Sequence, residues 1–324
     1  MSAGGVAPTR IDGNRRGRRV AAIDIGTNSV LLLVAEARDG DVAALEERAE
    51  ITRLGKDVDA DGNLSSDAIA RTVEVLREYA ARAEAWGATE IAAVATSAAR
   101  DAGNGADFLA RAEGALGTRP DIVSGLREAH LTYAGATMGL ETRRARHAVF
   151  DVGGGSTEII VDHGQGLEAT SLDIGAVRLT ERFIRDDDPP TEAALRELDA
   201  YVATALGNPD VPDIRSLELV GVAGTVTTLA AIAAGLAPYR PGALHGTRLK
   251  TEAVRGIVSD LAQKSVEARK SVPGLAPGRA DVIVAGGRIV HALCAHAGAA
   301  ALTVSERGVR WGLAQERLQS AAGG

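Results

Sequence analysis

The stretch Asp151-Val152-Gly153-Gly154-Gly155-Ser156-Thr157-Glu158 decides how the fold of this chain is interpreted. Apolar runs flank it at 147–152 and 159–161, so Asp151 ends one predicted strand and Glu158 stands at the entry to another. Three consecutive glycines expose a row of backbone N–H groups, and such a turn can close around a phosphate. Carboxylates beside phosphates commonly hold a divalent cation. The stretch therefore predicts a phosphate-binding turn with a metal site beside it, and a plain glycine-rich hairpin is the alternative.

A second stretch, Asp24-Ile25-Gly26-Thr27-Asn28-Ser29, follows the apolar run 20–23 and has the same pattern. The two stretches agree at one constant offset in three positions: Asp24 with Asp151, Gly26 with Gly153, and Ser29 with Ser156. A repeat at this spacing is too long for a solenoid. It predicts two similar domains that present their turns to a shared cleft, and a chance similarity of two hairpins is the weaker alternative.

The composition excludes several classes of function. The 324 residues are enough for two domains, and a charged content of 24% is ordinary for a globular protein. Because the net charge is −7, we expect no broad attraction to nucleic acid or to an anionic membrane. Aromatic residues make up only 3%, which leaves few platforms for stacking bases. A polyanionic ligand would therefore need positive contacts concentrated in a cleft.

The N-terminal segment and the single cysteine predict a cytoplasmic protein. Residues 1–18 are small, polar and basic, and we expect a disordered tail there. The paired arginines near residue 16 faintly suggest a twin-arginine signal, but Asp24 interrupts the apolar run that would have to follow. Cys294 has no partner for a disulfide and stands in an apolar stretch, so a core thiol is expected.

Hydrophobic periodicity predicts nearly the same order of elements twice. In the first half, strands are expected at 20–25, 30–37, 43–52, 90–95 and 121–123, with helices after Ser65 and over 106–116. In the second half, strands are expected at 147–152, 157–161, 166–172, 217–222 and 301–304, with helices between 177 and 205. A helix over about 124–138 begins the crossing between the halves, and another over about 308–319 closes the chain. This order indicates an α/β fold with helices on the faces of mixed sheets.

A third glycine turn, Gly224-Thr225, follows the strand predicted at 217–222 and stands at the start of a helix. The free N–H groups and the dipole of a helix N-terminus favour an anion. We therefore expect a third phosphate contact at this turn.

Nine stretches occur along the chain in an order that resembles the exopolyphosphatase/guanosine pentaphosphate phosphohydrolase (Ppx/GppA) family. They are 22–29, 95–102 with Asn104, 122–125 with Glu128-Ala129, 151–158, 171–179, Gly224-Thr225, His245-Gly246, 279–283 and 304–308. The resemblance implies two ribonuclease H-like (actin-like ATPase) domains with an interdomain cleft. The implied boundaries are 19–126 for the first domain and 127–311 for the second, with a C-terminal helix at about 312–324 joined to the first. The chain resembles the short, two-domain form of the family.

The resemblance implies that Glu128 activates water for attack on a terminal phosphorus. Hydrolysis of a phosphoanhydride needs a base that orients and deprotonates water in line with the leaving oxygen. The alternative is a solvated glutamate in the first turn of a helix. Asp151 and Glu158 are implied to hold Mg²⁺, or Mn²⁺ instead, and Asp24 is implied to face them from the first domain.

Phosphate binding is implied for the three turns and for two arginines, whose planar forks suit phosphate oxygens. The residues are Gly26, Thr27, Asn28, Ser29, Gly153, Gly154, Gly155, Ser156, Thr157, Gly224, Thr225, Arg100 and Arg279. Arg178 and Arg248 are weaker candidates, for which a surface ion pair is the alternative.

Two positions depart from the family pattern. Leu31 stands where many relatives carry an arginine, so one phosphate contact is expected to be missing. Trp311 stands where relatives usually carry a glutamate. The six histidines show no spacing of metal ligands and are expected to be structural.

The expected function is metal-dependent hydrolysis of the terminal phosphate of inorganic polyphosphate, with a preference for short chains. The nearest alternative is the same chemistry on guanosine pentaphosphate. A kinase or ATPase of the actin-like superfamily would need an adenosine pocket, for which Gly286-Gly287 is the one candidate. A non-catalytic regulator that binds polyphosphate or guanosine tetra- or pentaphosphate is a further alternative, although such a binder has no use for a base at Glu128. Relatives suggest a homodimer.

Overall fold

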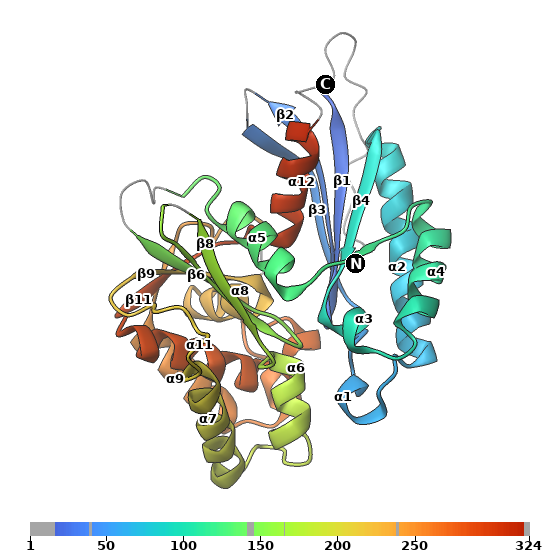
Figure 1. Cartoon of the computed structure of the whole chain (residues 1–324). Helices are drawn as coiled ribbons and strands as arrows, with labels where there is room; N and C mark the ends of the chain where they lie inside the picture. The colour runs from blue at the N-terminus through green and yellow to red at the C-terminus, as the bar shows by residue number, and fades with distance from the viewer. Residues whose placement is uncertain (1–16, 39–40, 141–145, 165, 238–239, 321–324) are drawn as a thin grey trace.

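The computed structural model describes residues 17–38, 41–140, 146–164, 166–237 and 240–320. It has two lobes, each built on one mixed β-sheet with helices on its faces (Figure 1). The tail expected at 1–18 lies outside these ranges as far as residue 16, and Arg18 pairs with Glu90 at 2.5 Å. No helix within the described ranges is long and apolar enough to cross a membrane.

The first sheet has the strand order β3-β2-β1-β4-β5. β1 pairs antiparallel with β2 and parallel with β4, while β3 pairs antiparallel with β2 and β5 parallel with β4. The strands are β1 (Arg19–Ile25), β2 (Ser29–Arg38), β3 (Asp41–Ile51), β4 (Glu90–Ala95) and β5 (Asp121–Ile122). The strands expected in the first half are therefore confirmed, within a residue or two at their ends.

Side chains along β1 alternate between two apolar clusters, as expected for a strand buried on both faces. One cluster joins Ile23 to helices α2 (Ser66–Ala85) and α4 (Gly105–Leu116). The other joins Val20 to α12 (Val309–Ser320), which returns from the far end of the chain to this sheet. Figure 1 shows α12 beside β1, on the face turned away from α2 and α4. The first sheet therefore depends on a helix that is encoded after the second sheet.

The second sheet repeats the order of the first with one extra edge strand, β10-β11-β9-β6-β7-β8. Its strands are β6 (His147–Val152), β7 (Thr157–Asp162), β8 (Leu167–Leu172), β9 (Glu218–Val222), β10 (Arg248–Lys250) and β11 (Ala301–Val304). Helix α5 (Gly125–Ala136) covers one face through a small apolar cluster. The larger cluster on the other face contains α7 (Glu192–Leu206), α8 (Ala223–Ala233), α9 (Thr251–Ala262) and α11 (Ile283–Ala297).

The register of the strands makes the duplication explicit. Asp24 on β1 lies opposite Leu31 on β2, and Asp151 on β6 lies opposite Glu158 on β7. Leu31 therefore occupies in the first domain the position that Glu158 occupies in the second. The two hairpins share a backbone plan, but one of them carries a pair of carboxylates and the other a single one.

The stretch between residues 240 and 300 differs most from the sequence-based expectation, which named no helix there. The structure contains α9, the short α10 (Val266–Arg269) and α11. Gly286 and Gly287 lie buried inside α11, and neither lines the large cavity described below. The structure therefore gives these glycines no part in the wall of that cavity, and the kinase or ATPase stays an alternative.

Candidate active site

A cavity of about 620 Å³ lies between the two sheets and is lined by both domains. The first domain contributes Asp24 and the turn 26–29, which follow directly on β1. The second contributes Asp151, the turn after β6, and residues 223–225 at the start of α8. The shared cleft predicted from the repeated turns is therefore present.

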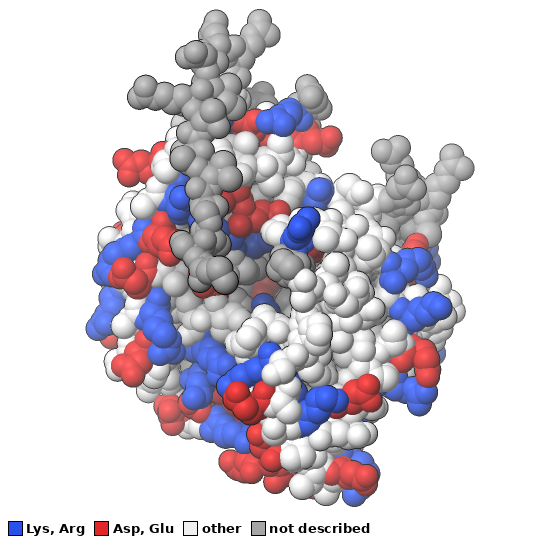
Figure 2. Space-filling view, turned by 180° about the vertical axis from the view of Figure 1, so that it is seen from behind, with Lys and Arg blue, Asp and Glu red and all other residues white. Residues whose placement is uncertain are grey.

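Over the face shown in Figure 2, Lys and Arg are interspersed with Asp and Glu and form no single basic surface among the described residues. This agrees with the net charge of −7. Positively charged side chains also line the cleft, at Arg48, Arg279 and Arg310.

The two hairpin turns have the same backbone geometry. Gly26 N donates to Ser29 O, and Gly153 N donates to Ser156 O, both at 3.0 Å. The second turn also touches the first, because a Cβ placed on Gly154 would lie 2.9 Å from Thr27 Cβ. Only glycine allows this approach, so the turns of the two domains meet across the cleft.

Four carboxylates gather where the two hairpins meet: Asp24, Glu128, Asp151 and Glu158. Burial raises the pKa of Asp24 to about 7, against the opposing charge of Arg310. Burial, and then the negative charge of Glu158, raises the pKa of Asp151 well above its usual value. Burial also raises the pKa of Glu158, although hydrogen bonds from Ser171 and Ser156 oppose the shift. The site therefore gathers four carboxyl groups in a place of low dielectric, where burial disfavours their charged forms.

Glu128 is buried at the start of α5, with 8% of its surface exposed. Ser124 caps this helix by accepting from Arg127 N at 3.2 Å, and the first turn carries Glu128 into the cleft. Burial raises the pKa of Glu128 well above its usual value, and the carboxylates of Glu158, Asp24 and Asp151 add to this shift. The alternative of a solvated glutamate is therefore wrong, while the catalytic role of Glu128 stays a prediction.

The donor set fits the cation that the resemblance implies. Asp24 Oδ1 and Glu128 Oε2 are buried oxygens that lack a hydrogen-bond partner in the described part of the chain. Within the same residues, no group of three or more His, Cys, Asp or Glu is arranged to hold a metal by itself. Mg²⁺ is commonly held by one or two carboxylates, several waters and the phosphates of the substrate. One or two carboxylates from the set Asp24, Asp151 and Glu158, completed by waters and substrate phosphates, would suit that mode of binding.

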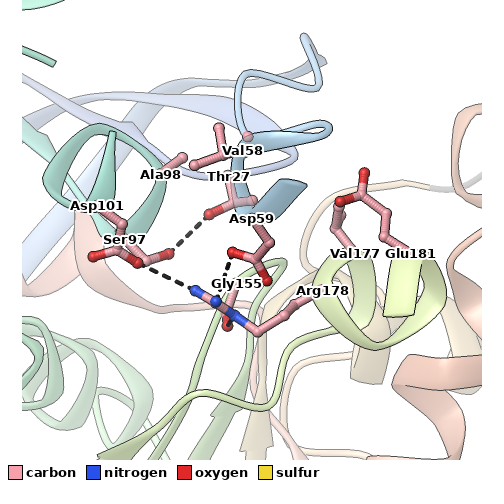
Figure 3. Close-up of a pocket in the computed structure, with 11 residues that line it drawn as sticks. Thr27, Val58, Asp59, Ser97, Ala98, Asp101, Gly155, Val177, Arg178 and Glu181 are labelled. Carbon is pink, nitrogen blue, oxygen red and sulfur yellow. Dashed lines mark hydrogen bonds and ion pairs between the residues drawn. The ribbon is translucent and has the colours of Figure 1, made fainter. Parts of the chain in front are cut away.

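The structure places the four candidate arginines differently. Arg279 lines the cleft, where its Nη2 donates to Ser29 Oγ at 3.3 Å. Arg100 Nη1 lies 3.9 Å from Glu128 Oε2 and donates to a backbone carbonyl at 3.2 Å. Arg248 pairs with Glu218 on the edge of the second sheet and does not line the cleft, so a surface ion pair describes it. Arg178 joins the two domains (Figure 3).

Among the residues predicted to bind phosphate, most line the cleft. Gly155, Thr157 and Arg100 do not. The Thr157 hydroxyl donates to Ile174 O, and Gly155 lines a smaller neighbouring cavity. Phosphate binding by these three residues stays a prediction.

Sequence reasoning missed Arg310, which enters the cleft from α12. Its Nη2 donates to Glu47 Oε2 at 2.6 Å and its Nη1 to Arg48 O at 3.1 Å. Trp311 Nε1 donates to the same Glu47 oxygen at 3.3 Å, and the Arg307 guanidinium lies 4.3 Å above the Trp311 ring. Trp311, which departs from the family pattern, therefore shares Glu47 with Arg310 and helps to hold Arg310 in the cleft. The motif at 304–308 was the nearest signal in the sequence.

Part of the lining of the cleft is apolar. Leu31 and Ile51 line it from the first domain, and Leu236 and Leu275 line it from the second. Leu31 therefore places an apolar side chain in the cleft opposite Asp24. A positively charged side chain at this position could bind a phosphate, and leucine cannot.

Comparisons with known proteins agree with this geometry. A model of the Ppx/GppA phosphatase family matches residues 33–321. The chain belongs to the Ppx/GppA phosphatase family. It is 36% identical to exopolyphosphatase 2 of Mycobacterium tuberculosis over 315 residues, which cover 91% of this chain and 97% of that protein.

Solved structures of the Ppx/GppA family are similar along almost the whole chain. A crystal structure of an exopolyphosphatase-like protein has a TM-score of 0.85 at 30% identity and covers 94% of this chain and 99% of its own. The Ppx/GppA family member from Aquifex aeolicus has a TM-score of 0.78 at 32% identity and covers 94% and 98%. The expected fold of two ribonuclease H-like (actin-like) domains and the expected enzyme class, a phosphatase of this family, are confirmed.

Proposed function

We propose that this protein removes the terminal phosphate of inorganic polyphosphate and releases orthophosphate, with Mg²⁺ bound at Asp24, Asp151 and Glu158. The observation that carries the proposal is the buried Glu128 carboxylate, which lies among these three acids in a cleft lined by glycine turns. The relatives named exopolyphosphatase support polyphosphate as the substrate class. A bound Mg²⁺ would offset the negative charge of the phosphates.

We assign separate roles to the turns, the arginines and Glu128. The N–H groups of the turns at 26–29, 153–156 and 224–225 hold successive phosphates. Arg279 and Arg310 add positive charge to the lining of the cleft. The Glu128 carboxylate orients a water molecule and takes its proton, and its raised pKa makes it a stronger base than an exposed glutamate. Arg100 keeps a share of this carboxylate ionised, because its charge opposes the shift.

A Glu128→Gln variant tests the proposal. A positioned base contributes about 10²–10⁴-fold to rate, so this variant should lose that much activity while its circular dichroism spectrum is unchanged. Phosphate release should be measured with Mg²⁺ on short polyphosphate, long polyphosphate, guanosine pentaphosphate and ATP. A fully active variant would remove Glu128 from the mechanism, and ATP turnover alone would favour a kinase or ATPase.

The apolar part of the cleft lining favours one second candidate, hydrolysis of the 5′ phosphate of guanosine pentaphosphate. Leu31, Ile51, Leu236 and Leu275 offer a surface suited to a nucleoside rather than to further phosphates. Release from guanosine pentaphosphate but not from polyphosphate would establish it. Binding of either compound without release by the wild-type chain would indicate a regulator.

We also propose a preference for short chains, because the chain resembles the short, two-domain form of the family. Equal turnover on short and long polyphosphate would contradict it. A homodimer is a further prediction of the family resemblance, and sedimentation equilibrium of the purified chain would check it.

A further inference from the structure

Arg178 joins the two domains beside the active site. It lies on the short helix α6 (Ala176–Leu179) of the second domain, and 19% of its side chain is exposed. Its Nε donates to Gly155 O at 2.8 Å, inside the turn that follows β6. Its Nη1 donates to Asp59 at 2.6 Å and its Nη2 to Asp101 at 3.2 Å, both in the first domain. Figure 3 shows the guanidinium beside Gly155, with its contacts to Asp59 and Asp101 drawn.

The contact with Asp101 continues toward the catalytic glutamate. Asp101 ends the short helix α3 (Ser97–Asp101), and its Oδ1 accepts from Arg100 Nε at 3.3 Å while its Oδ2 accepts from Arg178. Arg100 Nη1 in turn lies 3.9 Å from Glu128 Oε2. A continuous chain of charged groups therefore runs from Arg178 through Asp101 and Arg100 to Glu128.

This arrangement divides one carboxylate between two arginines. An arginine and a carboxylate without other partners commonly pair through two parallel hydrogen bonds. Without Arg178, both oxygens of Asp101 would be free for Arg100, and the guanidinium of Arg100 would turn from Glu128 toward Asp101. The same loss would remove the donor to Gly155 O and release the turn that holds phosphate.

We propose that Arg178 is a positioning residue for the phosphatase reaction: it holds Arg100 beside Glu128 by way of Asp101 and fixes the turn at Gly155, so that the catalytic base is correctly placed only when the two domains are together. This inference rests on the proposed function, because it assigns Arg178 a place in the same site. It goes beyond the weaker role of phosphate contact that the sequence suggested for Arg178.

The competing explanation is that Arg178 only stabilises the contact between the two domains. Arg185 offers a matched control for this explanation. Arg185 also crosses between the domains, since it pairs with Asp57, and Glu181 accepts from Asp57 N at 2.9 Å. In the described part of the chain, neither Asp57 nor Glu181 has a hydrogen bond or an ion pair with Arg100. Loss of Arg185 therefore removes an interdomain ion pair but leaves in place the series of charged side chains from Arg178 to Glu128.

The kinetic test compares Arg178→Ala, Arg178→Lys, Arg185→Ala, Asp101→Asn and the double variant Arg178→Ala/Asp101→Asn. A displacement of about 1 Å at a reacting group can reduce rate about 100-fold. We expect Arg178→Ala to lower kcat about 10- to 100-fold with a smaller change in KM, and Arg185→Ala to stay close to the wild type. Arg178→Lys should recover part of the loss, since an ammonium keeps the charge but not the fork. The double variant should be no slower than the slower single one.

Equal losses in Arg178→Ala and Arg185→Ala, or losses that multiply in the double variant, would overturn the inference and leave the proposed function intact. Hydrogen exchange supplies a readout that needs no turnover. In Arg178→Ala, but not in Arg185→Ala, the amides of 97–101 and 153–157 should exchange faster. If the wild type releases no phosphate, the proposed function fails, and unchanged exchange in Arg178→Ala would then refute the positioning role as well.

Discussion

Gly154→Ala tests whether the two domains meet through their turns. The added Cβ would lie 2.9 Å from Thr27 Cβ and 3.0 Å from Thr27 Cγ2, whereas ordinary contact between carbons is about 3.5–4.0 Å. A 2.8 Å hydrogen bond between the hydroxyls of Thr27 and Ser97 holds the Thr27 side chain in place. The turn of the second domain therefore has to move by about 0.6 Å or more.

The expected result is a loss of activity greater than the loss of stability. A shift of this size in groups that hold phosphate should reduce kcat/KM by about 10-fold or more. Overpacking costs about 1–3 kcal/mol, which lowers Tm by several degrees, about 2–4 °C for each kcal/mol in a domain of this size. Phosphate release and differential scanning calorimetry measure the two effects.

Gly114→Ala is the control for Gly154→Ala. Gly114 lies in α4, and a Cβ there would meet nothing within 4 Å. This change should leave kcat/KM unaltered and raise stability by about 0.5–1 kcal/mol, because alanine favours a helix more than glycine does. Equal kcat/KM in Gly154→Ala and the wild type would refute the direct contact between the turns.

Two further predictions concern the acids of the cleft and the apolar wall. In the metal-free protein, the free energy of unfolding should decrease as pH rises from about 4 to about 7, because the pKa of Asp24 is about 7 when folded and near 3.8 when unfolded, so the folded state binds the extra proton. Asp24→Asn should reduce this dependence in thermal melts, while the raised pKa values of Glu128, Asp151 and Glu158 keep part of it. A wild-type protein with no slope in this range would contradict the raised pKa of Asp24. Leu31→Arg should lower KM for polyphosphate several-fold, since it adds a positive charge to the wall of the cleft; an unchanged or higher KM would show that position 31 does not contact the substrate.

The parts of the site that could be predicted are those fixed by local sequence. Each hairpin carries its aspartate, glycines and serine within a few residues, so the local pattern alone is enough to put Asp24 and Asp151 at the ends of strands. The duplication then implies that the hairpins face each other, and the contact between Gly154 and Thr27 agrees with this.

The parts that could not be predicted depend on contacts between distant segments. Arg310 acts in the cleft because α12 returns to the first sheet, where Glu47 holds it across a separation of 263 residues. Nothing near Arg178 in the sequence indicates that its partners are Asp59 and Asp101. Gly286 and Gly287 resemble a turn in the sequence, but packing inside α11 overrides the low helix propensity of glycine.

The return of α12 to the first sheet also sets an order of events during synthesis. Residues 147–304, which contain every described strand of the second sheet, leave the ribosome before α12 does. Until then Val20, Ala22 and Leu33 lack the helix that covers them, so the first domain exposes an apolar surface while the second can already be complete. The domain that is translated first is thus the one that finishes folding last, and its uncovered sheet is the surface on which a nascent chain of this protein would be most prone to aggregate.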